Sequence, residues 1–252
     1  MRQLQTQHFL LFRLLRDHFL FLTRGQIERV LTLDTRSTNR ELVWLLRQQY
    51  LLRRYRADTF SNFQMPLYYL GKLGWHAVGN PLDSYKGYRR EIEQRSERGI
   101  EHTLSIYDVL LKFILESHVK RIIAGEDRIW QESIDLGNIP DAWIQFNNDE
   151  AFIEVDLHTE WGEALKRKFE NYRRFKESGG YRNRFPGCTF RVLVITTTEA
   201  RIDFMQQLGP SDDIWFCTLQ EFLREPLNHA HWFALRGFYA LPALSPSTKE
   251  KV

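Results

Sequence analysis

The feature that most constrains the fold is an almost unbroken apolar run, Phe190-Arg191-Val192-Leu193-Val194-Ile195-Thr196. Apolar and β-branched residues without a polar alternation are typical of a strand that is buried on both faces. A sheet that contains such a strand must be covered by other elements on both sides, which is the arrangement of α/β proteins. The run therefore predicts an α/β domain around a central sheet.

Helical and extended patterns surround this run in a defined order. From Gly99 onward the order is helix, strand, strand, strand, helix, strand, which predicts an α/β domain over residues 99–240 and a tail over 241–252. A double glycine, Gly179-Gly180, ends the long second helix. The predicted elements are helices at about 101–118, 160–178, 199–208 and 218–224, and strands near 128–134, 141–146, 151–157, 190–196 and 213–217.

The first 78 residues show a different pattern. Apolar spacing predicts a first helix near residues 9–19, a second helix capped by Thr23 and a third helix capped by Ser37. Strands at 50–56 and 66–70 follow, joined by a turn at 57–65. Three helices and a hairpin form the order of a winged helix. Residues 79–98 are charged and have little apolar periodicity, so they predict a linker, with a helix in its second half as an alternative.

The charges divide near the same point in the chain. The net charge is only +3, but residues 1–78 hold 12 Lys and Arg against 5 Asp and Glu, which leaves 23 against 27 in the remainder. Eleven of those 12 basic residues are arginines, whose planar guanidinium suits phosphate and guanine. The basic head predicts a nucleic-acid partner. A winged helix that binds a protein partner is the alternative.

The third helix and the hairpin hold the candidate DNA contacts. A helix in the major groove presents its N-terminal residues to base edges, and a wing meets phosphates or the adjacent minor groove. A solvated basic face is the alternative reading of the same residues. The expected DNA contacts are Arg36, Thr38, Asn39, Arg40 and Arg47 on the helix, and Arg53, Arg54 and Arg56 on the hairpin.

Three carboxylates fall at the ends of neighbouring predicted strands. Asp141 starts one strand, and Glu154 and Asp156 end the next. Carboxylates suit Mg²⁺, and a lysine nearby could position water or neutralise charge during phosphodiester cleavage. The following helix offers Lys166 and Lys168. In the alternative interpretation, Asp141 caps a turn and the two strand-end carboxylates face solvent.

These residues resemble a known fold and a known family. Pro140-Asp141, followed by Glu154-x-Asp156 and a helix, resembles the core of the PD-(D/E)XK nucleases, which have the restriction-endonuclease-like fold. Over roughly residues 8–220 the chain is similar to the replication-relaxation family of plasmid and mobile-element proteins. The motifs, in chain order, are Leu22-Thr23-x-x-Gln26-Ile27, Leu51-Leu52-Arg53-Arg54, Tyr69-Leu70-x-x-x-Gly74, His102-x-Leu104, Trp130-x-Glu132, Pro140-Asp141-Ala142, Glu154-Val155-Asp156, Lys168-x-x-x-Tyr172 and Arg191-Val192-Leu193-Val194-Ile195-Thr196.

The resemblance implies a winged helix-turn-helix head that binds double-stranded DNA, followed by a restriction-endonuclease-like α/β domain with a central mixed sheet. It implies a role in plasmid replication, relaxation or mobilisation. The nuclease motif has a lysine where this chain has Asp156. Either the fold is kept without cleavage, or Lys168, with Lys166 as second choice, replaces that lysine.

The presence or absence of DNA cleavage predicts two different functions for the second domain. Without cleavage, the second domain would serve as an interaction, DNA-clamping or dimerisation body of a DNA-binding protein. With cleavage, the chain would be a Mg²⁺-dependent endonuclease in which Asp141 and Glu154 bind the metal, Asp156 assists and Lys168 stabilises the phosphate. His158 stands where the family tends to carry glycine, and it is either a neighbour of the metal site or a surface residue.

Several other classes of protein find no support in the sequence. There is no run long enough for a membrane span, no phosphate-binding glycine loop and no Cys-x-x-Cys pair. Cys188 and Cys217 are far apart in apolar surroundings and predict core thiols in a reducing cytoplasm. The expected partners are double-stranded DNA, other replication or mobilisation proteins and a second copy of the chain, with no membrane.

Overall fold

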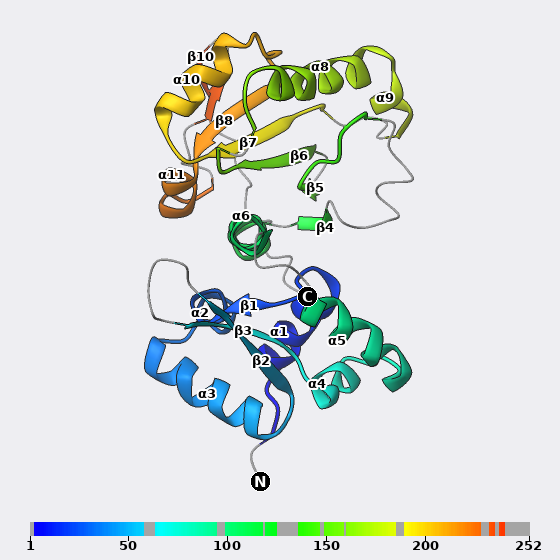
Figure 1. Cartoon of the computed structure of the whole chain (residues 1–252), viewed down its shortest axis with the longest axis vertical. Coiled ribbons are helices and arrows are strands. Elements are labelled where there is room, and N and C mark those ends of the chain that lie inside the picture. The colour runs from blue at the N-terminus through cyan, green and yellow to red at the C-terminus, as the bar shows by residue number, and fades with distance from the viewer. Residues whose placement is uncertain are drawn as a thin grey trace, which may run out of the picture. The chain divides into compact units, whose positions relative to one another are not determined.

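A computed structural model of the whole chain forms two compact units, Met1–Leu111 and Lys112–Val252 (Figure 1). Among the described residues, none of the helices has the length and apolar content that a membrane span requires. The structure describes residues 3–57, 64–94, 99–117, 119–124, 136–146, 149–158, 160–184, 189–227, 232–234 and 237–239.

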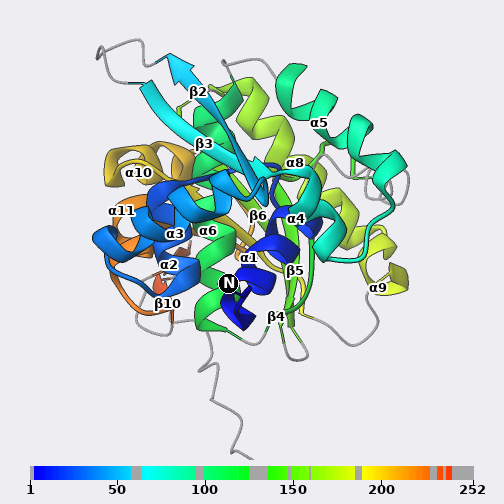
Figure 2. The same cartoon turned by 90° about the horizontal axis from the view of Figure 1, so that it is seen from below.

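The first unit is the predicted winged helix. Three helices precede a β-hairpin, and a short strand pairs with the hairpin to give a three-stranded antiparallel sheet in the order β1-β3-β2. Figure 2 shows β2 and β3 running side by side. The elements are α1 (Thr6–Asp17), β1 (Leu22–Thr23), α2 (Arg24–Leu31), α3 (Thr35–Arg47), β2 (Leu51–Ala57), β3 (Gln64–Leu70), α4 (Lys72–Ala77), η1 (Leu82–Ser84) and α5 (Tyr85–Gln94).

The starts of α2 and α3 are fixed by side-chain caps. Thr23 caps α2 as predicted, because its hydroxyl accepts the Gln26 N–H while the Gln26 side chain accepts the Thr23 N–H. The predicted cap of α3 is wrong: Asp34 is the N-cap, and its carboxylate accepts the Ser37 N–H at 2.9 Å. The Ser37 hydroxyl donates to the same carboxylate. Helix α3 therefore begins two residues before Ser37.

Much of the predicted linker at 79–98 folds as part of the first unit. Tyr85, Tyr88 and Ile92 of α5 are buried. The Tyr88 hydroxyl accepts the Leu70 N–H at 3.0 Å and donates to the Leu20 carbonyl at 3.2 Å. Tyrosines at helical spacing supply the buried stripe here, and a pattern based on aliphatic residues does not detect it. Residues 95–98 lie outside the described part of the chain.

Helix α6 (Ile100–Glu116) contributes residues to both units. In the first unit, the Leu104 carbonyl accepts a hydrogen bond from the buried Gln26 side chain, and Asp108 pairs with Arg29 at 2.8 Å. The compact first unit therefore extends to Leu111, past the domain start expected at residue 99. The predicted tail at 241–252 lies outside the described residues.

Backbone packs against backbone where β3 ends. The Gly71 N–H donates to the Tyr50 carbonyl at 2.9 Å. A Cβ atom at Gly71 would overlap the Gln49 carbonyl, and one at Gly74 would overlap the Tyr50 carbonyl. Glycine is needed at both positions because only a residue without Cβ permits this approach. Helix α4 consequently sits directly on the turn that joins α3 to β2.

The second unit is built on a seven-stranded mixed sheet in the order β10-β9-β8-β7-β6-β5-β4. Strands β6, β7 and β8 are parallel and their outer neighbours are antiparallel. The elements are β4 (Val119–Ala124), β5 (Ala142–Phe146), β6 (Asp149–Asp156), α8 (Glu163–Glu177), α9 (Gly180–Arg184), β7 (Val192–Thr196), α10 (Glu199–Gln207), β8 (Ile214–Thr218), α11 (Leu219–Arg224), β9 (Trp232–Ala234) and β10 (Gly237–Tyr239).

The element order of the second unit follows the sequence prediction with two differences. The first strand lies at 119–124, and the strand expected at 128–134 lies outside the described residues. Strands β9 and β10 were not predicted. Every residue of β7 is buried, as its apolar run predicts. Cys217 is buried and unpaired, whereas Cys188 lies outside the described residues.

Helices α8 and α10 cover one face of this sheet (Figure 1). Phe152, Val194 and Phe216 on that face pack with Phe169 of α8 and Met205 of α10 in a single buried cluster. Side chains alternate between the two faces of a strand, so Glu154 and Asp156 share the face of Phe152. The sequence thus directs two carboxylates toward the layer formed by α8 and α10.

Candidate functional site

One face of α3 carries most of the predicted base-contacting residues. Arg36, Asn39, Arg40 and Arg47 are exposed, at spacings that place them along one side of the helix. The Arg40 guanidinium donates to the Ser37 hydroxyl at 3.1 Å, which holds it over the first turn. Base contacts of Arg36, Asn39 and Arg40, and a phosphate contact of Arg47, stay predictions.

Thr38 requires a correction. The sequence predicts a base contact for it, but its side chain is fully buried. Position 38 falls on the same helical face as Leu42 and Leu45, which are also buried. Thr38 therefore belongs to the packed side of α3 and is not available to a ligand.

A buried polar contact joins α3 to α1. His8 Nδ1 accepts the Gln5 N–H at 2.9 Å, so that nitrogen carries no proton. The other ring nitrogen, Nε2, then donates to the Glu41 carboxylate at 3.1 Å. The ring also lies 5.5 Å from the ring of Trp44. This contact turns the carboxylate of α3 toward the interior of the unit.

Strand β2 divides the predicted wing arginines between its two faces. Arg53 is exposed, and its guanidinium lies 5.0 Å from the centre of the Tyr55 ring. Arg54 points the other way and donates to the Ile92 carbonyl of α5 at 2.7 Å. Arg54 was expected to contact DNA, but in the structure it ties the strand to α5. The side chain of Arg56 lies outside the described part of the chain.

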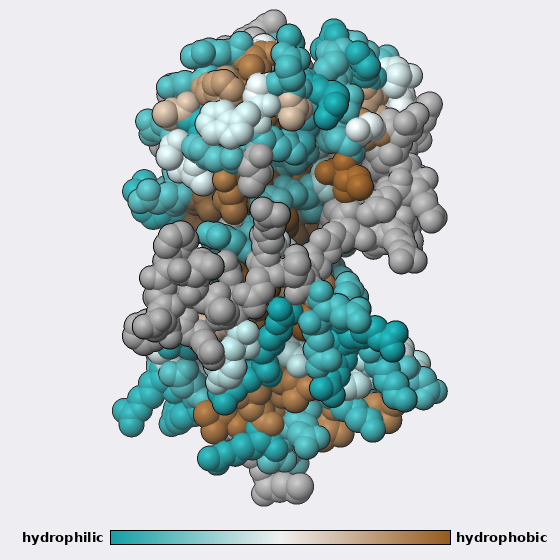
Figure 3. All heavy atoms as spheres, in the orientation of Figure 1, coloured by the Kyte–Doolittle hydropathy of each residue, from teal (hydrophilic) through white to brown (hydrophobic). Residues whose placement is uncertain are grey.

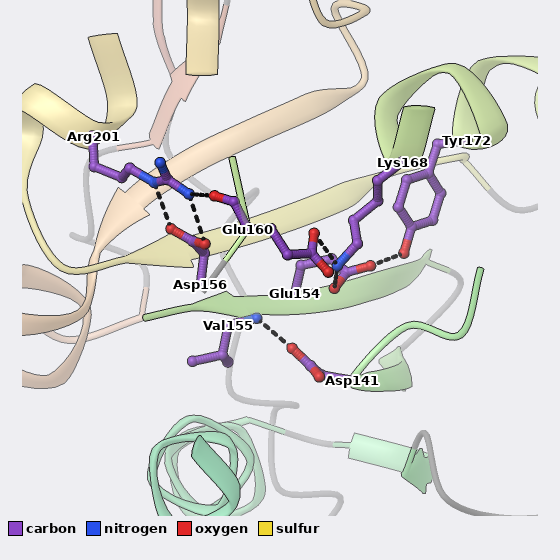
Figure 4. Close-up of polar contacts among 8 residues, drawn as sticks. All are labelled: Asp141, Glu154, Val155, Asp156, Glu160, Lys168, Tyr172 and Arg201. Atoms are coloured by element: carbon purple, nitrogen blue, oxygen red, sulfur yellow. Dashed lines mark hydrogen bonds and ion pairs between the residues drawn. The ribbon is translucent and has the colours of Figure 1, made fainter. Parts of the chain in front are cut away.

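Asp141, Glu154 and Lys168 come together in the second unit (Figure 4). Strands β5 and β6 are antiparallel, so the residue before β5 returns beside the end of β6. Asp141 Oδ2 accepts the Val155 N–H at 2.7 Å. Lys168 Nζ lies 3.1 Å from Glu154 Oε2, and Glu154 is only 5% exposed. The lysine that the sequence favoured is therefore the one that reaches the buried glutamate.

The pKa of Glu154 is set by opposing effects of burial and of its charged neighbours. Burial raises the pKa of Glu154 to about 7, and Lys168 opposes this rise while Asp141 adds to it. Burial lowers the pKa of Lys168, but Glu154, Glu160 and Asp141 together raise it above its ordinary value. Glu160 also contacts Lys168 Nζ at 3.1 Å. Lys168 is thus held charged between two glutamates, and Glu154 exchanges its proton near neutral pH.

Tyr172 completes this cluster. Tyr172 lies one helical turn after Lys168 on α8, and its hydroxyl donates to Glu154 Oε1 at 2.5 Å. Burial raises the pKa of Tyr172 far above its ordinary value, and the neighbouring Glu154 raises it further. The sequence included Tyr172 in a family motif with Lys168 but assigned it no role. The spacing of four residues, which places both side chains on one helical face, is the signal that could have linked it to Glu154.

Asp156 takes no part in this cluster. Its carboxylate accepts two hydrogen bonds from Arg201 of α10, at 2.8 and 3.0 Å, and one from the Thr196 hydroxyl at 3.0 Å. The sequence expected Asp156 to assist at the metal site, whereas the structure pairs it with a buried arginine. Arg201 was missed because its partner lies 45 residues away in sequence.

The remaining candidates lie at the edge of the site. Lys166 is exposed. His158 is also exposed, and its φ of 62° is in the left-handed region that favours glycine. This backbone conformation is one that glycine adopts without strain, so glycine would also fit at this position. The His158 ring lies 6.0 Å from that of Trp161.

Two carboxylates of the cluster have the oxygen ligands that a hard divalent cation such as Mg²⁺ prefers. Mg²⁺ prefers oxygen ligands and usually keeps several waters, taking only one or two protein carboxylates. Asp141 and Glu154 fit this requirement, although Glu154 would have to share its oxygens with Lys168 and Tyr172. Within the described residues no group of three or more His, Cys, Asp and Glu side chains is placed to hold a metal.

The two units define a winged helix joined to a mixed-sheet α/β unit with a lysine and carboxylate cluster. Residues 12–191, more than half of the chain, match the replication-relaxation family, and the chain belongs to this family. It is similar to a solved structure of the transcriptional regulator SlyA, at 16% identity and a TM-score of 0.24, over 44% of this chain and 76% of that one. No curated protein matches it.

Proposed function

We propose that this protein binds double-stranded DNA through α3 and the β2–β3 hairpin, and that it acts in the replication, relaxation or mobilisation of a plasmid or other mobile element. The observation that carries this proposal is the division of α3 into two faces. Leu42 and Leu45 are buried on one face, while Arg36, Asn39 and Arg40 are exposed on the other.

The exposed residues have the chemistry that base edges require. An arginine can donate two hydrogen bonds to guanine, and an asparagine can pair with adenine in the same way. Among the described residues, neither Arg36 nor Asn39 has a side-chain hydrogen bond that would compete with such a contact. Arg47, near the C-terminal end of α3, would meet phosphate, as would Arg53 on the hairpin.

The test compares two pairs of basic residues that are equally spaced on exposed helix faces. Arg36→Ala with Arg40→Ala should weaken binding to a preferred duplex more than to a random duplex, by ~1 to 3 kcal/mol for each bidentate base contact. Lys86→Ala with Arg90→Ala, on α5, is the matched control and should leave this preference unchanged. Fluorescence anisotropy with labelled duplexes measures both. Equal losses on the two duplexes would restrict the α3 arginines to phosphate contacts.

A second candidate function is a Mg²⁺-dependent DNA endonuclease. The contact between Lys168 Nζ and Glu154 favours it, because it places a cation beside one of the two proposed metal ligands. Asp141 and Glu154 would hold the metal, and Lys168 would neutralise the charge that develops on the phosphate. When bound, Mg²⁺ would supply an activated water and polarise the phosphate oxygens. Asp156, paired with Arg201, would act only by holding the end of β6.

Cleavage of supercoiled plasmid in Mg²⁺ or Mn²⁺ separates the two candidates. An endonuclease should nick or linearise the plasmid, and Asp141→Ala with Glu154→Ala should abolish the reaction. Lys168→Ala should do the same, while Lys166→Ala, an exposed lysine on the same helix, should retain activity. DNA binding without cleavage by the wild-type chain would contradict the endonuclease. The second unit would then serve as an interaction, clamping or dimerisation body.

A further inference from the structure

We infer that Val43 recognises the 5-methyl group of a thymine, so that the preferred duplex holds a T·A pair beside the bases read by Asn39 and Arg40. This inference rests on the proposed function and extends it, because it names an apolar determinant of sequence preference. The charge of the head assigns no role to this apolar residue.

The first observation is the position of Val43. Val43 is 47% exposed, whereas Leu42 and Leu45 on the other face of α3 are buried. It stands three residues after Arg40 and four after Asn39, so it shares their side of the helix. Together with Thr35 and Arg36, these residues line a shallow, open stretch of surface along α3.

The second observation is the composition of the surface around Val43. Hydrophilic and apolar side chains adjoin in the region of α3 (Figure 3). Arg36, Arg40 and Arg47 surround the valine with positive charge, while Glu41, the sole acidic residue of α3, is turned toward His8. The exposed face of α3 therefore carries positive charge around one apolar side chain, that of Val43.

Duplex DNA matches this combination better than a protein surface does. In the major groove, thymine presents a methyl group next to the hydrogen-bonding edges of its neighbours, and the phosphates on both sides are negative. A protein partner would have to combine a small apolar group with an acidic rim. The arginine content and the charge division of the chain favour the nucleic acid.

The experiment removes the methyl group from the DNA and its partner from the protein. A duplex is first selected from a random-sequence pool with the full wild-type chain. Each thymine is then replaced in turn by deoxyuridine, which differs only by the missing methyl group. Wild-type binding should weaken about fourfold at one thymine, the equivalent of ~0.8 kcal/mol for one buried carbon group. Val43→Ala should bind the thymine and deoxyuridine duplexes equally.

Leu73→Ala is the matched control, since Leu73 of α4 is also 47% exposed in the same unit. This variant should keep the wild-type preference for thymine. The inference is overturned if no thymine shows the effect while specific binding persists, or if Val43→Ala retains the full preference. Both results would leave the proposed DNA binding intact. Failure to select any duplex would instead overturn the proposed function, and the inference with it.

Discussion

Arg201 of α10 holds the carboxylate of Asp156 at the end of β6 through two parallel hydrogen bonds, from Nε to Oδ2 and from Nη2 to Oδ1. Both side chains are buried. A buried charge is stable only when it is paired and hydrogen-bonded, so each residue depends on the other. Asp156 is thus one half of an internal ion pair.

Arg201→Met should lower the free energy of unfolding by about 3 to 5 kcal/mol, because it leaves the Asp156 carboxylate buried without its partner. Combining it with Asp156→Leu should recover most of the loss, since no buried charge remains. Urea denaturation followed by circular dichroism measures both variants. Arg173→Met, on the exposed surface of α8, is the control and should change stability by less than about 0.5 kcal/mol. Additive losses in the double variant would refute the pairing.

The stability of the second unit should depend on pH through Glu154. Its pKa in the folded protein is about 7, above the ordinary value of 4.5, so the folded state holds a proton that the unfolded state releases between these values. Stability should therefore fall as pH rises from about 4.5 to about 7, by roughly 2 to 4 kcal/mol. Glu154→Gln should remove this component. Urea titrations at several pH values test it, and a constant difference between wild type and variant would contradict it.

Tyr172→Phe should move the same titration upward. The Tyr172 hydroxyl donates to Glu154 and lowers its pKa, so losing this bond should raise that pKa further. The variant should also lose about 1 to 3 kcal/mol of stability, because a buried carboxylate oxygen loses its donor. Carboxyl carbon chemical shifts recorded against pH report the pKa directly. An unchanged Glu154 titration would show that this hydrogen bond does not govern its charge.

Arg53 and Arg54 should have separable effects. Arg53→Ala should reduce the slope of log affinity against log salt by about 0.9, as expected for one lost phosphate contact. Arg54→Ala should leave that slope unchanged and lower the stability of the first unit by about 1 to 3 kcal/mol, because Arg54 donates to the Ile92 carbonyl. Salt titrations of DNA binding measure the slope for each variant, and thermal denaturation measures the loss of stability. Equal salt slopes for the two variants would contradict the division between the strand faces.

Elements with regular apolar spacing were predictable from the sequence. The buried run at β7 and the capping box of Thr23 and Gln26 depend on neighbours in the chain, so local patterns identify them. The start of α3 was misplaced because Asp34 and Ser37 are both good caps, and the competition between them depends on backbone geometry. Helix α5 was assigned to a linker, with a helix only as an alternative for its second half, because its buried side chains include tyrosines, one of whose hydroxyls bonds to a distant strand.

The candidate site was predictable only in part. Asp141, Glu154 and Lys168 follow one another in the order that the family resemblance implies, and the structure brings them together. The fate of Asp156 was not predictable, because it depends on an arginine that reaches the strand from a later helix. Thr38 was misassigned because a position near a helix start was considered without its helical face.

The two glycines at the end of β3 have a consequence for how the head would meet DNA. Because α4 lies on the Gln49–Tyr50 turn without side chains between them, the base of the hairpin is fixed to the end of α3. The distance between α3 and the β2–β3 hairpin is then fixed when the protein folds, before DNA binds. Such preorganisation reduces the conformational entropy lost on association. A side chain as small as alanine at Gly74 should therefore disturb the fit to a groove and the neighbouring phosphates at once.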